Sequence, residues 1–390
     1  MSKFLCNKCY YVEETEVPPK KCIVCNADEN EFSLITYPDK HHIPEYWEEY
    51  LKKKTEKIRK NQELAGENGF SFAFITDIHW GPNNKFSAAL VKRVMDECNL
   101  SYCVNGGDTV SGAGLCQAEL IIGELKESFD YFSEIEPKLL TALGNHDPAY
   151  STFDAPEFYV ENLTTEQIYE SIFRYEEKYP DRVMGPGKTY FYADDKAHKV
   201  RIVVLNTFDV PSDETLPDGR AKYNKMRLFG YRKEQLDWFA NVALDVPGKD
   251  WTIILATHIA PSCADEICRN DDVILGIIDA FRKGEKFEIS SECDNPLYNV
   301  EIKADYTNKG GSFALWVSGH IHEDSQLVVN DTLCLSVISD WNHQHEKLPM
   351  QRCDGTTNEH AFDVFTIDTE NHKIYATRIG AGQDRIYRYE

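Results

Sequence analysis

The chain lacks any run of about 18 apolar residues, the minimum length for a helix that spans a bilayer. It also lacks the apolar stretch of a secretory signal, because polar residues follow Met1 within a few positions. We therefore expect no contact with a membrane, and we place the protein in the cytoplasm, where thiols stay reduced.

Basic residues are comparatively scarce. The chain holds 42 Lys and Arg against 65 Asp and Glu, for a net charge of -23. A long nucleic acid is bound through a basic surface that displaces counterions. The local concentration of positive charge in residues 52–60 is interpreted as the solvated face of a helix. We therefore expect no long nucleic acid as a partner.

A reducing compartment excludes a disulfide framework for the twelve cysteines. The pairs Cys6-x-x-Cys9 and Cys22-x-x-Cys25 are separated by twelve residues. Such pairs place four thiolates around one tetrahedral ion, so we expect one zinc or iron ion here. A segment this short buries too little apolar surface to fold alone, so the ion would supply its stability. The other cysteines are read as buried free thiols.

The composition divides the chain into three zones. Residues 1–36 are rich in cysteine and turns, and residues 37–68 are predicted to form a linker with a helix. Residues 69–390 are predicted to form one large domain, in which apolar strands alternate with helices. Strands are predicted at residues 70–76, 102–105, 138–143, 200–206, 251–257, 313–317, 326–329, 332–338, 361–367 and 373–378, and helices at 87–98, 115–135 and 231–244.

Polar residues follow many of these strands at the point where each ends. Continuous apolar strands separated by helices indicate an α/β fold with a sheet buried on both faces, and ligands gather beyond the carboxyl ends of such strands. Any one of these residues alone is typical of a turn, but the whole set predicts a site. Its members are Asp77, His79, Asp108, Asn145, His146, His258, His320 and His322.

The residue types indicate metal chemistry. Carboxylate, imidazole and amide oxygen suit manganese, iron and zinc, whereas the absence of a thiolate argues against a structural zinc site. Two ions roughly 3.5–4 Å apart can clamp the attacking and leaving oxygens of a phosphoryl group. One carboxylate must bridge them, and Asp108 is favoured because Gly106 and Gly107 let the backbone turn sharply before it.

The ordered motifs resemble those of the calcineurin-like metallophosphoesterases. They are Asp77-Ile78-His79, Gly107-Asp108, Gly144-Asn145-His146-Asp147, a lone His258, and Gly319-His320-Ile321-His322, in the family's order across about residues 70–325. The resemblance implies a four-layer α/β/β/α sandwich with two mixed sheets and the site at one edge.

The resemblance also implies individual roles. The first ion would be held by Asp77, His79, Asp108 and His322, and the second by Asp108, Asn145, His258 and His320. His146 would protonate the leaving oxygen or stabilise the phosphoryl oxygens, and Asp147 would orient His146. Many family members carry a further acid shortly after the bridging Asp, whereas here residues 109–111 are Thr-Val-Ser.

The N-terminal zone resembles the rubredoxin-like knuckle module found at the end of rubrerythrins. Tyr10-Tyr11-Val12, Pro18-Pro19 and Phe32 match its aromatic and proline placement, but Tyr10 and Asn26 stand where the family usually has glycine. The module would be either a structural or docking element or an electron carrier to the metal pair.

We therefore predict a dinuclear metal-dependent phosphoesterase in which a metal-bridging hydroxide attacks phosphorus and His146 acts as the acid. The expected substrate is a small phosphodiester or phosphomonoester, with a nucleotide among the candidates. Three alternatives stay open. They are a redox or regulatory protein in which the cysteine module serves a metal-pair sensor, a nuclease acting on short nucleic acid, and an inactive binding scaffold.

Long segments between the motifs would set specificity. They span residues 148–187, 207–230 and 284–311 and are rich in aromatic residues. Lys225 and Arg227 either reach a phosphate or are ordinary surface charges. His343 and His345 either stand behind the metal ligands or belong to a loop.

Overall fold

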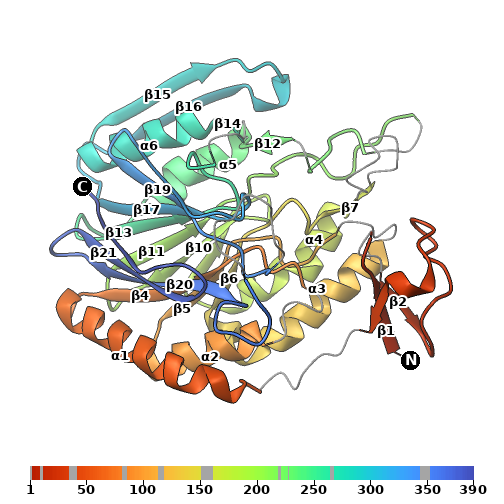
Figure 1. Cartoon of the computed structure of the whole chain (residues 1–390). Helices are drawn as coiled ribbons and strands as arrows, with labels where there is room; N and C mark the ends of the chain where they lie inside the picture. Colours follow the sequence, from red (N-terminus) through yellow and green to blue (C-terminus); the bar gives the residue numbers. More distant parts are fainter. Residues whose placement is uncertain are drawn as a thin grey trace.

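Two mixed β-sheets pack face to face in the computed structural model, with helices on both outer faces (Figure 1). This α/β/β/α arrangement confirms the predicted fold class. The structure describes residues 2–8, 12–34, 42–80, 86–112, 118–150, 161–217, 221–226, 228–263, 268–342 and 352–390.

The first sheet contains both ends of the large domain. Its strand order is β22-β21-β20-β4-β5-β6, with β4, β5 and β6 parallel to one another. The C-terminal strands β20–β22 add to it in antiparallel fashion. Its strands are β4 (Phe70–Ile75), β5 (Tyr102–Asn105), β6 (Leu139–Thr141), β20 (Ala361–Asp368), β21 (Lys373–Gly380) and β22 (Arg385–Arg388).

The second sheet has the order β18-β19-β17-β13-β11-β10-β9, and β11, β13, β17 and β19 run parallel. Its strands are β9 (Arg182–Met184), β10 (Phe191–Asp195), β11 (Val200–Val204), β13 (Thr252–Ala256), β17 (Ser312–Ser318), β18 (Ser325–Val329) and β19 (Thr332–Ser336).

Helices cover the two outer faces (Figure 1). The α1 and α2 helices pack against the first sheet, and α6 packs against the second. Acidic residues in the first turn of α6 and basic residues in its last turn complement the helix dipole. The helices are α1 (Glu48–Ala65), α2 (Ser87–Cys98), α3 (Ala118–Phe132), α4 (Thr165–Ser171), α5 (Lys233–Trp238) and α6 (Asp271–Lys283). Short 3₁₀ turns lie at Glu29–Glu31, Glu45–Trp47, Ser133–Lys138, Phe173–Lys178 and Pro296–Tyr298, and a π-helical turn lies at Phe239–Ala243.

Smaller sheets lie outside the sandwich. A three-stranded sheet at the N-terminus has the order β2-β1-β3. Short pairs are formed by β7 with β8, β12 with β14, and β15 with β16. These strands are β1 (Ser2–Cys6), β2 (Val12–Thr15), β3 (Phe32–Leu34), β7 (Ala149–Tyr150), β8 (Glu161–Asn162), β12 (Phe229–Gly230), β14 (Cys268–Arg269), β15 (Lys286–Ser291) and β16 (Val300–Asp305).

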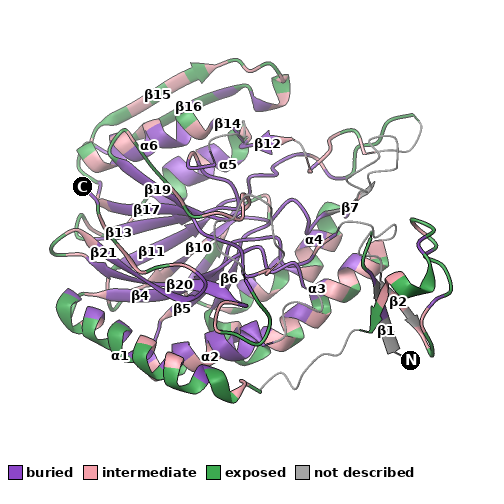
Figure 2. Ribbon diagram, in the orientation of Figure 1, coloured by how far each residue is buried: buried purple, intermediate pink, exposed green. Residues whose placement is uncertain are grey.

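The core lies between the sheets and under the helices, where the central strands are buried along their whole length (Figure 2). Strand β4 presents Phe70, Phe72 and Phe74 on alternate positions, and Phe72 stacks on Phe365 of β20 with ring centroids 5.4 Å apart. Sheets covered on both faces need apolar residues at every position, which explains the continuous runs in the sequence.

The predicted helix of residues 37–68 is present as α1. Leu51 and Ile58 are buried at helical spacing against β20 and β21, and Trp47 is buried just before the helix. The helix ends at Gly66, whose φ of 73° a glycine adopts without strain. The division of the chain near residues 36 and 68 stays a prediction. Each helix in the described part of the chain is too short or too polar to cross a bilayer.

Candidate metal centre

The polar residues predicted as a site follow the carboxyl ends of parallel strands in both sheets. Strand β4 leads to Asp77 and His79, β5 to Asp108, β13 to His258, and β17 to His320. Strand β6 leads to Asn145 and His146, and His322 follows β17 two residues after His320. The two sheets present these ends at the same edge of the sandwich.

Two groups of potential ligand atoms form there and share one carboxylate. Within each group the ligand atoms lie within 4.8 Å of one another. The first group consists of Asp77, His79, Asp108 and His322, and the second of Asp108, His258 and His320. This is the sharing expected of a residue that bridges two ions.

The spacing in the first group suits a metal ion. The Nε2 atoms of His79 and His322 are 3.1 Å apart, and Nε2 of His322 lies 3.2 Å from Oδ1 of Asp77. Metal–nitrogen bonds of about 2.0–2.1 Å at right angles separate two ligand atoms by roughly 3 Å. The second group is similar, with Nε2 of His258 lying 3.2 Å from Oδ2 of Asp108.

Asn145 completes the second group with an amide oxygen. Its Oδ1 lies 3.2 Å from Nε2 of His258 and 3.1 Å from Nδ1 of His320, while its amide nitrogen contacts the sulfur of Met226 at 3.4 Å. The amide is thus turned with its oxygen toward the two imidazoles. Imidazole, carboxylate and amide oxygen converging in this way are suitable ligands for manganese, iron or zinc.

The backbone of the centre adopts an uncommon conformation. Asp77, His79, Asp108, His320 and His322 all have positive φ, between 45° and 74°. Asp and His tolerate this region better than most residues, but it still costs of order 1 kcal/mol or more at each position. Such strain gathers at functional sites, where the surrounding fold must maintain it.

Glycines allow the strand-end loops to approach one another. A Cβ atom on Gly144 would lie 2.0 Å from the backbone nitrogen of Asp108, and one on Gly319 would lie 2.2 Å from Oδ2 of Asp77. These contacts are far shorter than any real Cβ makes, so the close approach requires glycine.

A family model for calcineurin-like phosphoesterases matches residues 70–324, well over half of the chain. The chain belongs to the calcineurin-like phosphoesterase family. The family match supports a hydrolase of phosphoric esters, and the pair of Asp/His groups supports a metal-dependent enzyme of this kind. No curated protein sequence matches the chain.

Several solved structures resemble the phosphoesterase in fold. A phosphopantetheinyl hydrolase from Mycobacterium tuberculosis is 12% identical, with 70% of this chain and 91% of that chain covered and a TM-score of 0.33. The GAP50 anchor in the inner membrane complex of Plasmodium is 12% identical, with 83% and 89% covered and a TM-score of 0.42. A conserved Streptococcus pneumoniae protein described as a phosphoesterase is 10% identical, with 82% and 98% covered and a TM-score of 0.30. Likenesses this remote carry no argument about substrate.

Backbone carbonyls orient two imidazoles of the phosphoesterase. Nδ1 of His258 donates to the carbonyl of Gly106 at 2.9 Å, which leaves Nε2 facing Asp108 and Asn145. Nδ1 of His146 makes a short contact with the carbonyl of Ser111. A partner on one ring nitrogen sets both the tautomer and the ring orientation.

Charges in the centre shift the pKa values of its carboxylates and imidazoles. Burial raises the pKa of Asp77, but the charges of His322 and His258 outweigh it and hold that pKa well below its usual range. Burial and the charge of His146 lower the pKa of His79 well below 6.5. Burial lowers the pKa of His258, but the charges of Asp108 and Asp77 dominate and raise it to about 9. Acidic and basic side chains thus lie close together in one buried site, where the charge of each shifts the pKa of the others.

Asp147 differs from its predicted role. Its carboxylate accepts from the backbone nitrogens of Gly144 at 2.8 Å, Asp108 at 3.1 Å, Thr109 at 2.7 Å and Val110 at 3.2 Å. It therefore ties the loops after β5 and β6 together, while Ser111 contacts His146 in its place. Burial, followed by the charge of Asp108, raises the pKa of Asp147 to about 7.

Aromatic residues that the sequence reasoning missed surround both ligand groups. Trp341 packs on His79, while Phe208 and Phe229 lie against His258 and His320, with ring centroids 5.8 and 5.6 Å apart. Nothing in the sequence around them separates these aromatics from core residues. Their role depends on the tertiary contact alone.

Lys225 is neither a surface charge nor a phosphate ligand in the structure. It is 2% exposed, and its Nζ donates to the carbonyls of Phe208 at 2.8 Å and Val210 at 3.2 Å. These hydrogen bonds stabilise the loop that carries Phe208. Arg227, His343 and His345 lie outside the described residues.

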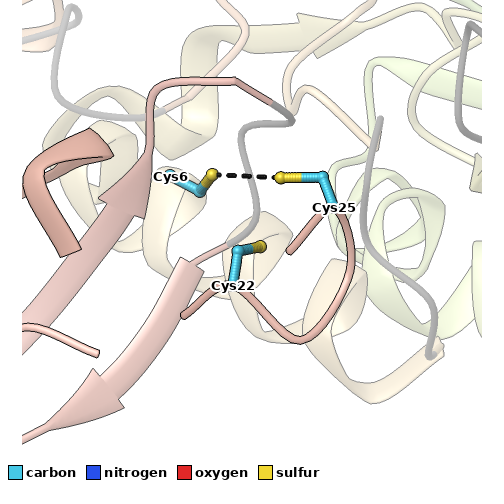
Figure 3. Close-up of side chains that lie close together, drawn as sticks. All are labelled: Cys6, Cys22 and Cys25. Carbon is cyan, nitrogen blue, oxygen red and sulfur yellow. Dashed lines mark hydrogen bonds between the residues drawn. The ribbon is translucent and has the colours of Figure 1, made fainter. Parts of the chain in front are cut away.

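Three cysteines of the N-terminal zone point toward one another (Figure 3). The sulfur atoms of Cys6, Cys22 and Cys25 lie within 4.8 Å of one another, and those of Cys6 and Cys25 are 3.5 Å apart. Cys6 and Cys22 are buried, whereas Cys25 is exposed. Cys9, the predicted fourth ligand, lies outside the described residues. The cluster only hints at the predicted module.

Proposed function

We propose that the phosphoesterase hydrolyses a small phosphate ester with two metal ions. The observation that carries this proposal is the pair of ligand groups that share Asp108 at the edge where both sheets end. The family match, which covers the whole of this site, supports it independently.

The proposed ligands follow the two groups. Asp77, His79, Asp108 and His322 would hold one ion, and Asp108, Asn145, His258 and His320 would hold the other. When bound, the ions supply positive charge that activates a water nucleophile and offsets the charge of the phosphoryl oxygens. Manganese, iron and zinc all suit these ligands.

His146 is proposed as the proton donor to the leaving oxygen. Its Nδ1 is engaged by the carbonyl of Ser111, so Nε2 is the nitrogen that titrates. Nε2 faces the centre and lies 3.9 Å from Oδ2 of Asp108, and the ring packs edge-on against His79 with centroids 4.8 Å apart. A donor placed there can protonate an oxygen that departs from phosphorus.

The proposed substrate is a small phosphodiester or phosphomonoester. The net charge of -23 disfavours a long polyanion, because such a ligand needs a basic surface. A nucleotide stays among the candidates as one class of small phosphate ester.

Metal analysis and a substrate panel test the proposal. Purified protein should bind two ions per chain at the Asp/His centre and hydrolyse p-nitrophenyl monoesters or diesters when Mn²⁺ is added. The preferred ester in the panel will separate monoesterase from diesterase activity. Binding of two ions without hydrolysis of any ester would contradict the enzymatic proposal and favour a binding scaffold.

We also propose that Cys6, Cys9, Cys22 and Cys25 hold one zinc or iron ion with a structural role, in a rubredoxin-like module. The three converging thiols support this proposal, and ligation by thiolates fits a reducing compartment such as the cytoplasm. Purified protein should contain one further ion that Cys22→Ser loses, and visible thiolate absorption would identify it as iron. Equal metal content in Cys22→Ser and the parent protein would contradict the assignment.

A further inference from the structure

Trp341 packs against two imidazoles of the first ligand group. Its ring centroid lies 4.8 Å from that of His79 with the planes inclined by 48°, and 5.9 Å from that of His322 with the planes inclined by 83°. The indole is partly exposed, whereas His79 is 4% exposed. The indole therefore forms an outer wall on this side of the centre.

His79 is oriented differently from other imidazoles of the centre. His258 and His146 each use Nδ1 to contact a backbone carbonyl. In the described part of the chain, the one side-chain hydrogen-bond contact of His79 runs from Nε2 to His322, and the same Nε2 lies 3.8 Å from Oδ2 of Asp108. A metal-binding imidazole is normally fixed through its other nitrogen. Ring packing takes that place for His79, from Trp341 and from His146.

Arg352 holds the segment that carries Trp341. Its guanidinium, in a residue only 4% exposed, donates to the carbonyls of Ser339 at 2.7 Å, Asp340 at 2.8 Å and Trp341 at 2.9 Å. It also donates to the carbonyls of Asn358 and Glu359. The planar guanidinium of arginine has five N–H donors and can bond to this many carbonyls from one position. The ammonium group of lysine has three donors, so lysine is not equivalent here.

The same segment is hydrogen-bonded to the loop of the first ligand group. The backbone nitrogen of Trp341 donates to the carbonyl of Asp77 at 3.2 Å, and that of Asp340 donates to the carbonyl of Thr76 at 2.9 Å. The indole is therefore fixed relative to Asp77 as well as packed on His79.

We propose that Trp341 is a positioning residue of the first ligand group. It holds His79 and His322 in the orientation that binds metal, and Arg352 fixes the indole for this task. The inference rests on the proposed function, because it concerns the ion that this group would bind. Trp341 acts through the two imidazoles and is not a catalytic residue.

Binding of Mn²⁺ to folded variants tests the proposal. Trp341→Leu should bind one of its two ions about 10–100-fold more weakly, the usual effect of losing a residue that orients a ligand. The second ion should keep its affinity, so the electron paramagnetic resonance spectrum should change from a coupled pair to a single ion. Trp341→Phe should retain the pair because a ring still packs on His79. Arg352→Lys should resemble Trp341→Leu.

Trp238→Leu is the matched control. This indole is 5% exposed and packs on Tyr190 and Tyr192, away from the centre. It should lose stability without losing affinity for either ion. All affinities are measured at a temperature below the onset of unfolding of each variant. Unfolding is then not mistaken for the loss of metal-binding side chains.

Two results would overturn the inference. In the first, Trp341→Leu keeps both metal affinities and its KM values are unchanged. In the second, it keeps both metal affinities but raises KM only for esters with aromatic groups, which would make Trp341 a substrate-binding residue. Failure of the unaltered protein to bind a pair of ions would instead contradict the proposed function.

Discussion

At the scale of single residues, the tasks that we propose for Asp108 and His146 are separable. Asp108 belongs to both ligand groups, and its Oδ1 also accepts from the backbone nitrogen of His146 at 2.8 Å. His146 lies outside both groups. Removing each side chain should therefore have a different effect on metal binding.

Asp108→Ala should lose both ions and all activity, because neither group is complete without this carboxylate. His146→Ala should keep both ions and lose about 10²–10⁴-fold in kcat, the usual contribution of a positioned acid. Metal content and kcat measured on the same preparations check both expectations. An unchanged kcat in metal-loaded His146→Ala would refute its role as proton donor.

At the scale of elements, the loops after β5 and β6 behave as one unit. Asp147 joins them through four backbone nitrogens, and Gly144 lets them approach. The segment of residues 109–111, which lacks the family's usual acid, contributes backbone groups to this unit instead. Hydrogen bonds between the Asp147 carboxylate and the main chain thus hold Asp108 in place.

Gly144→Ala should weaken binding of both ions by more than about tenfold, because its Cβ would collide with Asp108 and displace the shared carboxylate. Gly123→Ala is the matched control. It lies in α3, where an added Cβ meets no atom within 4 Å. This control should bind metal normally and gain up to about 1 kcal/mol of stability. Equal metal affinity in both variants would contradict the proposed constraint.

At the scale of the whole molecule, a buried charge network connects the C-terminal strands to the loop after His322. Arg378 donates to Asp363 at 2.9 and 3.0 Å and to Asp324 at 2.6 Å. Burial raises the pKa of Asp363, but the charges of Arg378 and Arg385 outweigh it and lower that pKa to about 2. The network links strands β20–β22 to Asp324, in the loop that follows His322.

Because the pKa of Asp363 is lowered in the folded state, the stability of the protein should depend on pH in the acidic range. A carboxylate whose pKa is lower in the folded state stabilises the fold above its unfolded pKa of about 4, and this contribution is lost as the pH falls through about 2. The contribution is roughly 2 kcal/mol. Urea unfolding between pH 2 and pH 5 should therefore show a shallower pH dependence in Asp363→Asn than in the unaltered protein. Equal slopes would contradict the assignment.

The sequence by itself determined the ligand types and the edge where they meet. Buried parallel strands must be apolar throughout, so the first polar residues after them are conspicuous, and Asp77, Asp108 and His258 were found in this way. The elements were also predictable, with strand 102–105 and helix 87–98 found at their predicted bounds. The pair β15–β16 was missed inside the segment 284–311, which was read only as a loop, and helix α6, which precedes that segment, was not predicted.

Only the tertiary structure decided which groups hold the ligands in position. Trp341 reaches His79, Arg352 reaches three carbonyls of residues 339–341, and Asp147 turns to backbone nitrogens instead of His146. These contacts join segments far apart in the chain, and local periodicity carries no signal for them. A polar residue after a strand is placed by that strand, but its partners are placed by how the sheets and loops pack.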